Sequence, residues 1–280
     1  MKYHIHTLGC QMNIADSLRL ASGLEKLGAT STENIADADI AVLNTCVVRQ
    51  SAEDRAYGWL HRVGALKRDT KPDLTVGLMG CLVGVKGNKK IANTFPDIDV
   101  FLPPSDPGPL LNLVEQQQDI QKSETDFVSR RHALQDGELI LPAADCGTTF
   151  ISYVPVVYGC SHACTFCIIP FRRGIERSRP VEQIVAECRS LAEQGVKEIT
   201  LLGQIVDRYG YDLPDHPNLA MLLERVHETP GLERIRFLTS HPNYLDDELL
   251  RTVAEMPKIC DHIEVPVQSG SNEVLENMRR

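Results

Sequence analysis

Short apolar segments alternate with segments of helical periodicity through the first part of the chain. The predicted elements, in chain order, are strand 3–8, helix 15–27, strand 40–43, helix 52–66, strand 75–79, strand 100–102 and helix 109–117. Strands that alternate with helices in this way indicate a parallel sheet whose connections are crossover helices. We therefore expect an N-terminal doubly wound α/β domain over residues 1–118.

The alternation of apolar strands and helices then stops. Residues 116–134 are polar and charged with little apolar periodicity, which predicts a linker over 119–148 that contains a short strand at 138–141. After it the alternation resumes, with strands at 151–157, 198–202, 234–238 and 262–265 and helices at 181–194, 219–227 and 246–256. Four β/α units in series predict part of a (β/α) barrel over 149–280. Because the sequence stops inside a predicted helix that begins at 271, we expect a C-terminally truncated chain.

Composition and charge narrow the class of protein. With 42% hydrophobic residues in 280, the chain can bury a full core. No segment approaches the roughly 18 uninterrupted apolar residues of a membrane span, and residues 1–9 lack the pattern of a secretory leader. The expectation is a cytoplasmic protein without membrane contact. In that reducing compartment, its nine cysteines indicate metal or catalytic chemistry rather than disulfides.

A net charge of −9 argues against broad electrostatic attraction to nucleic acid. Any such contact would be local. The densest basic cluster comprises Arg172, Arg173, Arg177 and Arg179. It is either a solvated loop or a surface that contacts phosphates.

Three cysteines directly follow the predicted strand at 151–157. Cys160, Cys164 and Cys167 form a CxxxCxxC loop at the carboxyl end of that strand, where barrel enzymes place their chemistry. A four-iron cluster held by three thiolates keeps one iron open for a substrate or cofactor. Zinc is the main alternative, but a closed zinc site needs a fourth ligand. A ferredoxin-like electron carrier would use four cysteines for each cluster, with shorter spacing.

The first domain contains a second set of cysteines. Cys10, Cys46 and Cys81 each lie just past a predicted strand. Because the carboxyl ends of parallel strands share one edge of a sheet, these three residues can converge on a second three-thiolate site. Each one alone would be interpreted as a small buried apolar residue. Asn13 and Asn44 are candidates to orient the ligands.

These motifs together resemble the radical S-adenosylmethionine (SAM) methylthiotransferase family over essentially the whole chain. The matching segments are Leu-Gly-Cys-Gln-Met-Asn at 8–13, Asn-Thr-Cys-Val-Val-Arg at 44–49, Gly-Cys at 80–81, Gly-Cys-Ser-His-Ala-Cys-Thr-Phe-Cys-Ile-Ile-Pro at 159–170, and Arg-Gly at 173–174. Four further segments, at 178–180, 202–204, 239–242 and 266–271, are similar to the tRNA branch of the family, the MiaB-type 2-methylthio-isopentenyladenosine synthases.

The resemblance implies two [4Fe-4S] clusters, SAM as cofactor, and transfer of a methylthio group to carbon 2 of the isopentenyladenosine next to the anticodon. One SAM would methylate a sulfur on the cluster of Cys10, Cys46 and Cys81, and a second would provide a 5′-deoxyadenosyl radical. It also implies that Gly203 and Gln204 contact SAM. Ser240 and Gln268 are further candidates for SAM or substrate contacts. Arg172 and Arg173 are candidates for the tRNA phosphates.

The resemblance further implies a flavodoxin or ferredoxin as electron donor, a separate sulfur donor, and the tRNA anticodon stem-loop as partner. We expect a monomer. The sequence departs from the family at residues 203–206, where Gly-Gln-Ile-Val replaces Gly-Gln-Asn-Val, so a polar contact is lost or supplied differently. Without the family's C-terminal RNA-binding domain, we expect weak affinity for tRNA.

Two alternatives stay open at this point. One is a methylthiotransferase for threonylcarbamoyl-adenosine in tRNA or for a ribosomal protein. The other is a catalytically silent iron-sulfur fragment, which the abrupt end at Arg280 favours.

Overall fold

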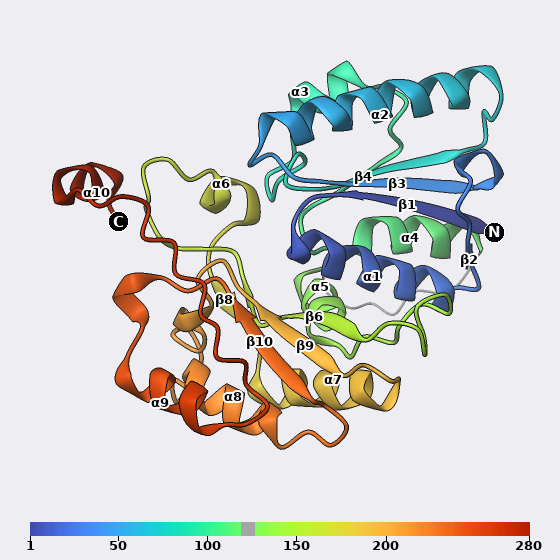
Figure 1. The fold of residues 1–280 in the computed structure, drawn as a ribbon. Coiled ribbons are helices and arrows are strands. Elements are labelled where there is room, and N and C mark those ends of the chain that lie inside the picture. Colours follow the sequence, from blue (N-terminus) through green and yellow to red (C-terminus); the bar gives the residue numbers. More distant parts are fainter. Residues whose placement is uncertain (119–126) are drawn as a thin grey trace. The chain divides into compact units, whose positions relative to one another are not determined.

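The computed structural model describes residues 1–118 and 127–280, which fold as two compact units (Figure 1). The first comprises the described residues of Met1–Gly137 with Leu141–Ala144, and the second comprises Glu138–Ile140 with Asp145–Arg280. None of the helices in the described part of the chain is long and apolar enough to cross a bilayer.

The first unit is built on a parallel sheet in the order β2-β1-β3-β4-β5. Its strands are β1 (Lys2–Leu8), β2 (Thr30–Ser31), β3 (Ile40–Thr45), β4 (Thr75–Gly80) and β5 (Val100–Leu102). Its helices are α1 (Gln11–Lys26), η1 (Ile35–Asp37), α2 (Gln50–Asp69), α3 (Lys89–Thr94), α4 (Gly108–Gln117) and α5 (Phe127–Asp136). This is the doubly wound order of flavodoxin-like folds, in which the strand order reverses between β1 and β3. The predicted fold class is confirmed.

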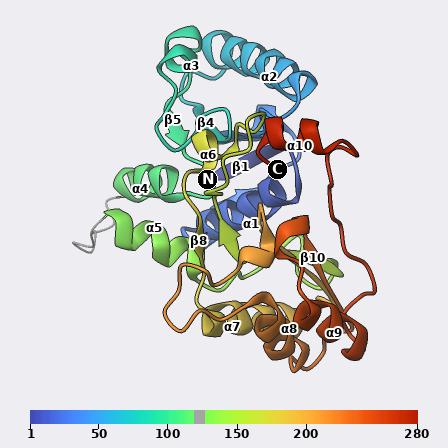
Figure 2. The same ribbon diagram turned by 90° about the vertical axis from the view of Figure 1, so that its left-hand side faces the viewer.

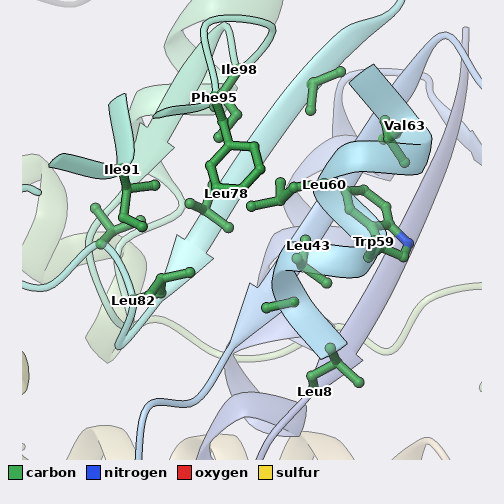
Figure 3. Packing of buried hydrophobic residues seen from close by; sticks show 14 of the residues in the cluster. Leu8, Leu43, Trp59, Leu60, Val63, Leu78, Leu82, Ile91, Phe95 and Ile98 are labelled. Atoms are coloured by element: carbon green, nitrogen blue, oxygen red, sulfur yellow. The ribbon is translucent and has the colours of Figure 1, made fainter. Parts of the chain in front are cut away.

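Helices cover both faces of this sheet because side chains along a strand alternate in direction. In the fully buried β3, Ala41 and Leu43 pack toward α2 and α3, whereas Ile40 and Val42 pack toward α1 and α4. Figure 3 shows the first of these two cores, where residues of α2 such as Trp59 lie against the strands. The sheet is therefore buried on both sides, and only its edges and strand ends are left for a site.

The second unit contains three parallel strands in the order β10-β9-β6. They are β6 (Ile151–Pro155), β9 (Glu198–Leu202) and β10 (Arg234–Leu238), and the short β7 (Val157–Tyr158) pairs antiparallel with β8 (Arg177–Ser178). The helices are α6 (Ile169–Arg173), α7 (Val181–Glu193), η2 (Val206–Arg208), α8 (Leu219–His227), η3 (Pro242–Tyr244), α9 (Asp247–Glu255) and α10 (Asn272–Met278). Consecutive parallel strands are neighbours, and α8 packs beside α7 and α9, as in part of a (β/α) barrel (Figure 2).

Two predicted strands are not formed. At 262–265 the chain makes no ladder, because the His262 N–H bonds to the Cys260 carbonyl (2.7 Å) in a tight turn. The turn interrupts the pairing between the bridge of Ile235 with Ile259 and the bond from the Ser240 N–H to the Glu264 carbonyl (3.0 Å). The segment 138–141 is irregular as well.

The predicted linker 119–148 extends beyond the described residues at 119–126, and its described part contains α5. That helix is tied to the first unit, since Arg130 forms an ion pair with Glu115 of α4 (2.6 Å) and Gln135 donates to the Ser105 carbonyl (2.8 Å). The limits 1–118, 119–148 and 149–280 stay predictions.

A fully buried ion pair holds α7 to the strands of the second unit. Arg179 and Glu187 are 0% exposed and 2.6 Å apart, and Arg179 also donates to the carbonyl of Pro155 at the end of β6 (2.8 Å). Desolvation makes such a pair costly to bury, but removal of one partner is costlier because the other charge is left unpaired in the core.

We predict that Glu187→Ala lowers the free energy of unfolding by roughly 3–5 kcal/mol, because Arg179 would lose its counter-charge. Urea denaturation of the purified chain measures this loss. The matched control is Glu182→Ala on the same helix, whose ion pair with Arg225 (2.9 Å) is exposed. That variant should unfold almost as the wild type does. Equal losses in the two variants would contradict the importance of burial.

Candidate iron-sulfur cluster sites

Cys10, Cys46 and Cys81, the edge cysteines, follow β1, β3 and β4 in the first unit. The register pairs Leu8 with Thr45 and Thr45 with Gly80, so the three strands end at the same level. The edge cysteines therefore leave the sheet on neighbouring loops. Two of these loops flank the point where the strand order reverses, which is where open α/β sheets bind ligands.

A buried hydrogen-bond network ties these loops together. The Asn13 amide donates to Asn44 Oδ1 (2.9 Å) and to the Thr45 carbonyl (3.0 Å), and the Asn44 amide donates to the Asn13 carbonyl (2.8 Å). The Thr45 carbonyl also accepts the N–H of Cys81 (3.0 Å). Asn13 lies one turn after Cys10, and Asn44 and Thr45 directly precede Cys46. The network thus connects the backbones that carry all three thiols.

The sulfur atoms differ in their surroundings. Cys10 is exposed at the N-terminus of α1, Cys46 is half-buried, and Cys81 is buried. The backbone N–H of Val48 lies 3.4 Å from Cys46 Sγ and donates to it.

Cys160, Cys164 and Cys167, the loop cysteines, lie between β7 and α6 in the second unit. Gly159 has a φ of +68°, and a Cβ there would collide with the carbonyl of Ile175, so only glycine fits this close crossing. The Cys160 N–H donates to the Gly174 carbonyl (3.0 Å), and the Cys167 N–H donates to the Cys164 carbonyl (3.1 Å). These bonds hold the loop in a compact form.

Cys160 is the buried member of this loop. Burial raises the pKa of its thiol, and the nearby negative charges of Glu176, Cys167 and Cys164 raise it further, whereas the hydrogen bond from the His162 N–H to Sγ (3.4 Å) acts in the opposite direction. Cys164 and Cys167 therefore lie close enough to Cys160 to act on its thiol. A cationic iron centre would relieve their repulsion.

Both sets have donors suited to an iron-sulfur cluster. In each, three thiols are available, and a backbone N–H two residues onward donates to a sulfur, at Cys46 and at Cys160. Within residues 1–118 and 127–280, no group of three or more His, Cys, Asp or Glu side chains is arranged to hold a metal ion. The structure therefore presents no closed zinc site in that range. A four-iron cluster does not require its three thiolates to surround a single metal ion, because each thiolate binds a different iron.

Three further candidates, Gly203, Gln204 and Ser240, lie just after β9 and β10. The Gly203 N–H donates to the Leu238 carbonyl (2.9 Å), so the loops after these two strands lie side by side. Gln204 is half-buried, and Ser240 is 2% exposed. Gln268, by contrast, is exposed and has a φ of +72°. No described contact joins it to Gly203 or Ser240.

The two arginines selected from the sequence lie on α6. Arg172 is half-buried and Arg173 is 7% exposed, so Arg172 is the more accessible of the two. Arg172 Nε is buried without a partner among the described residues.

Sequence reasoning missed a group of aromatic and charged residues beside the loop that carries Cys160, Cys164 and Cys167, which we call the cluster loop. The ring of His162 lies 4.8 Å from that of His241, and His162 Nε2 bonds to the Tyr244 hydroxyl (3.1 Å). The Arg208 guanidinium lies 4.9 Å from the centre of the Tyr244 ring and forms an ion pair with Glu176 (2.9 Å). The segment at 239–242 contained the only signal for His241.

Comparison with known proteins agrees with this geometry. Residues 2–103 match the model of Uncharacterized protein family UPF0004, and residues 154–280 match that of the Radical SAM superfamily. A tRNA-2-methylthio-N(6)-dimethylallyladenosine synthase from Herpetosiphon aurantiacus is 43% identical over all of this chain and 60% of its own length. One of the same name from Roseiflexus sp. is 45% identical over all of this chain and 56% of its own length.

The chain belongs to the radical SAM methylthiotransferase family. It spans between half and two thirds of the length of these curated relatives. Among solved structures, the radical SAM methyltransferase TsrM from Kitasatospora setae has a TM-score of 0.68 at 13% identity, covering 99% of this chain and 61% of that chain. The cobalamin-dependent radical SAM enzyme OxsB has a TM-score of 0.61 at 15% identity, covering 99% and 45%. These two show the fold alone.

Membership in the radical SAM superfamily implies a [4Fe-4S] cluster and SAM. The loop beside β10 fits such a ligand, because Ser240 Oγ is buried with no hydrogen-bond partner in the described structure. The roles of Gly203, Gln204, Ser240, Gln268, Arg172, Arg173 and the six cysteines stay predictions.

The Asn13–Asn44–Thr45 network predicts a specific cost at Gly80. This residue has a φ of +99°, and a Cβ would lie 2.5 Å from the Thr45 carbonyl. The left-handed backbone costs alanine about 1–2 kcal/mol, and the collision should add about 1–3 kcal/mol. Urea unfolding should therefore show a larger loss of stability for Gly80→Ala than for Gly28→Ala, whose φ is +79° with open space around it. Equal losses would mean that Thr45 moves aside freely.

Proposed function

We propose that this chain carries the cluster-binding units of an enzyme that transfers a methylthio group to carbon 2 of N6-dimethylallyladenosine next to the anticodon of tRNA. The observation that carries the proposal is the network of Asn13, Asn44 and Thr45, which joins the three edge cysteines in a unit of their own. A second cluster at that edge gives the transferred sulfur a place to be held. The names of the curated relatives support the same reaction.

In this proposal the loop cysteines hold a [4Fe-4S] cluster with one open iron. With SAM bound there and an electron from the external donor, the cluster would supply a 5′-deoxyadenosyl radical able to remove hydrogen from a carbon that has neither a leaving group nor an acidic proton. The protein's own residues orient the ligands. Gly203 and Gln204 follow β9, Ser240 follows β10, and the Glu176 N–H bonds to Ser161 in the cluster loop (3.1 Å).

The edge cysteines hold the second cluster in this proposal. Asn13 and Asn44 keep their loops in register, and the Val48 N–H donates a hydrogen bond to Cys46 Sγ. Because Cys10 is exposed and Cys46 is half-buried, the cluster would be accessible from the sheet edge rather than sealed in the core.

The modified adenosine needs an apolar contact for its dimethylallyl group. Phe166, Phe171 and Ile175 lie in or just after the cluster loop and are 52%, 76% and 82% exposed. Large exposed apolar side chains commonly mark interaction sites. With a net charge of −9, phosphate contacts would be local, through Arg172 and Arg173. The proposal also includes a flavodoxin or ferredoxin as electron donor, a separate sulfur donor, a monomeric state and a cytoplasmic location.

Iron content after anaerobic reconstitution tests the two-cluster proposal. The wild-type chain should bind about eight irons, four for each cluster. Replacement of all three edge cysteines by alanine, or of all three loop cysteines, should leave about four. Cys146→Ala combined with Cys260→Ala is the control and should still bind about eight. About four irons in the wild type would contradict a second cluster.

Product analysis separates the two sets of cysteines. Under reducing conditions with SAM, the edge-cysteine variant should still form 5′-deoxyadenosine but transfer no methylthio group to tRNA, because only the sulfur-carrying site is lost. The loop-cysteine variant should do neither. If the wild type holds both clusters and forms no 5′-deoxyadenosine, the chain is a silent iron-sulfur fragment. Methylthiolation of threonylcarbamoyl-adenosine or of a ribosomal protein, with none of dimethylallyladenosine, would overturn the proposed substrate.

A further inference from the structure

His241 is a buried histidine with one ring nitrogen engaged. It lies between β10 and η3 and is 0% exposed. Its Nδ1 accepts the backbone N–H of Asn243 (3.2 Å), so Nδ1 carries no proton. A neutral imidazole has one proton, which must then be on Nε2. Burial lowers the pKa of His241 to about 4, and the positive charges of Arg280, His162 and Arg208 act in the same direction, so the ring is neutral near pH 7.

The resulting Nε2–H donor has no acceptor in the described structure. Nε2 is buried from solvent and makes no hydrogen bond. A buried donor without an acceptor is uncommon, because it loses its bond to water without replacement. The neighbouring Ser240 Oγ is buried and unpartnered as well. Two consecutive side chains at the carboxyl end of β10 therefore present polar groups that nothing in the described chain satisfies.

The position of His241 indicates which groups its Nε2–H donor can contact. Its ring lies 4.8 Å from that of His162, and His162 stands between Cys160 and Cys164. The Asp207 carboxylate, after β9, accepts the backbone N–H of His241 (2.9 Å) and fixes the main chain there. The unpaired donor is thus held beside the cluster loop, at the edge where barrel enzymes bind their ligands.

We propose that His241 donates a hydrogen bond from Nε2 to an oxygen of SAM bound at the open iron of the cluster loop. SAM offers acceptor oxygens in its carboxylate and in its ribose, and a carboxylate makes the stronger bond with an N–H. The role is that of a neutral donor that binds and orients the cofactor. This inference rests on the cluster that the proposed function assigns to Cys160, Cys164 and Cys167.

Two substitutions separate the ring's two hydrogen bonds. His241→Asn keeps a short side chain that can still accept the Asn243 N–H, but it has no donor at the position of Nε2. His241→Gln places an amide N–H close to that position. The dissociation constant for SAM, measured by equilibrium dialysis on the reconstituted chain without turnover, should rise about tenfold in His241→Asn, or about 1.4 kcal/mol. It should rise by less than about threefold in His241→Gln.

Methionine and 5′-deoxyadenosine then identify the oxygen. If the acceptor is the carboxylate, His241→Asn weakens binding of methionine and leaves that of 5′-deoxyadenosine unchanged, and the reverse holds for the ribose. Either result supports the proposal. Iron content and the unfolding midpoint of each variant are measured in parallel. Equal SAM affinity in wild type and His241→Asn, or equal losses in both variants together with lowered iron or midpoint, would overturn it.

The wild-type chain distinguishes failure of the cluster assignment from failure of this inference. If the wild type binds no iron at the loop cysteines, the cluster assignment is wrong and the His241 proposal is wrong with it, because its acceptor would be absent. If the wild type binds iron and SAM but His241→Asn binds SAM equally well, only the role of His241 is wrong.

Discussion

The carboxyl ends of parallel strands lie at one edge of a sheet, and this constraint decides where the three edge cysteines can meet. In the first unit, the paired ends of β1, β3 and β4 bring together loops that are far apart in the sequence. Chain geometry alone would leave these loops free to diverge. The hydrogen bonds of Asn13 and Asn44 remove that freedom, and their burial makes each bond costly to break.

In the second unit, ion pairs rather than side-chain amides connect the elements. The buried pair of Arg179 and Glu187 lies behind the strands, where it fixes α7, whereas the pair of Arg208 and Glu176 lies at the loop edge. Glu176 also donates its backbone N–H to Ser161, so the second pair links the segment after β9 to the cluster loop. The first pair therefore fixes α7 to the strands, and the second connects the segment after β9 with the loop of the three cysteines.

The sequence predicted the parallel sheet of the first unit well, because its strands are short apolar segments separated by amphipathic helices. It predicted α5 poorly: residues 127–136 have almost no apolar periodicity, and the helix is held by ion pairs such as Arg130 with Glu115. The strand expected at 262–265 failed for a related reason. A backbone turn after Cys260 interrupts the pairing with β10, and such a turn leaves no hydrophobic signal.

The candidate sites also differ in how much of them the sequence reveals. The CxxxCxxC spacing selected three of the candidate thiols, and the positions just after predicted strands selected the other three. His241 could not be selected in this way, since its interest comes from a ring nitrogen that is buried and unpaired, which only the folded chain reveals.

The structure explains how the chain can have Ile205 where the family's Gly-Gln-Asn-Val motif has its asparagine. Where the family's motif has an asparagine, Ile205 is 5% exposed and offers no polar group. Two residues onward, Asp207 accepts the backbone N–H of His241 through both carboxylate oxygens (2.9 and 3.2 Å). Burial raises the pKa of Asp207 to about 6, so the carboxylate is largely charged near pH 7. The polar contact after β9 is thus directed at the loop after β10, and it fixes the main chain of the residue that presents the unpaired donor.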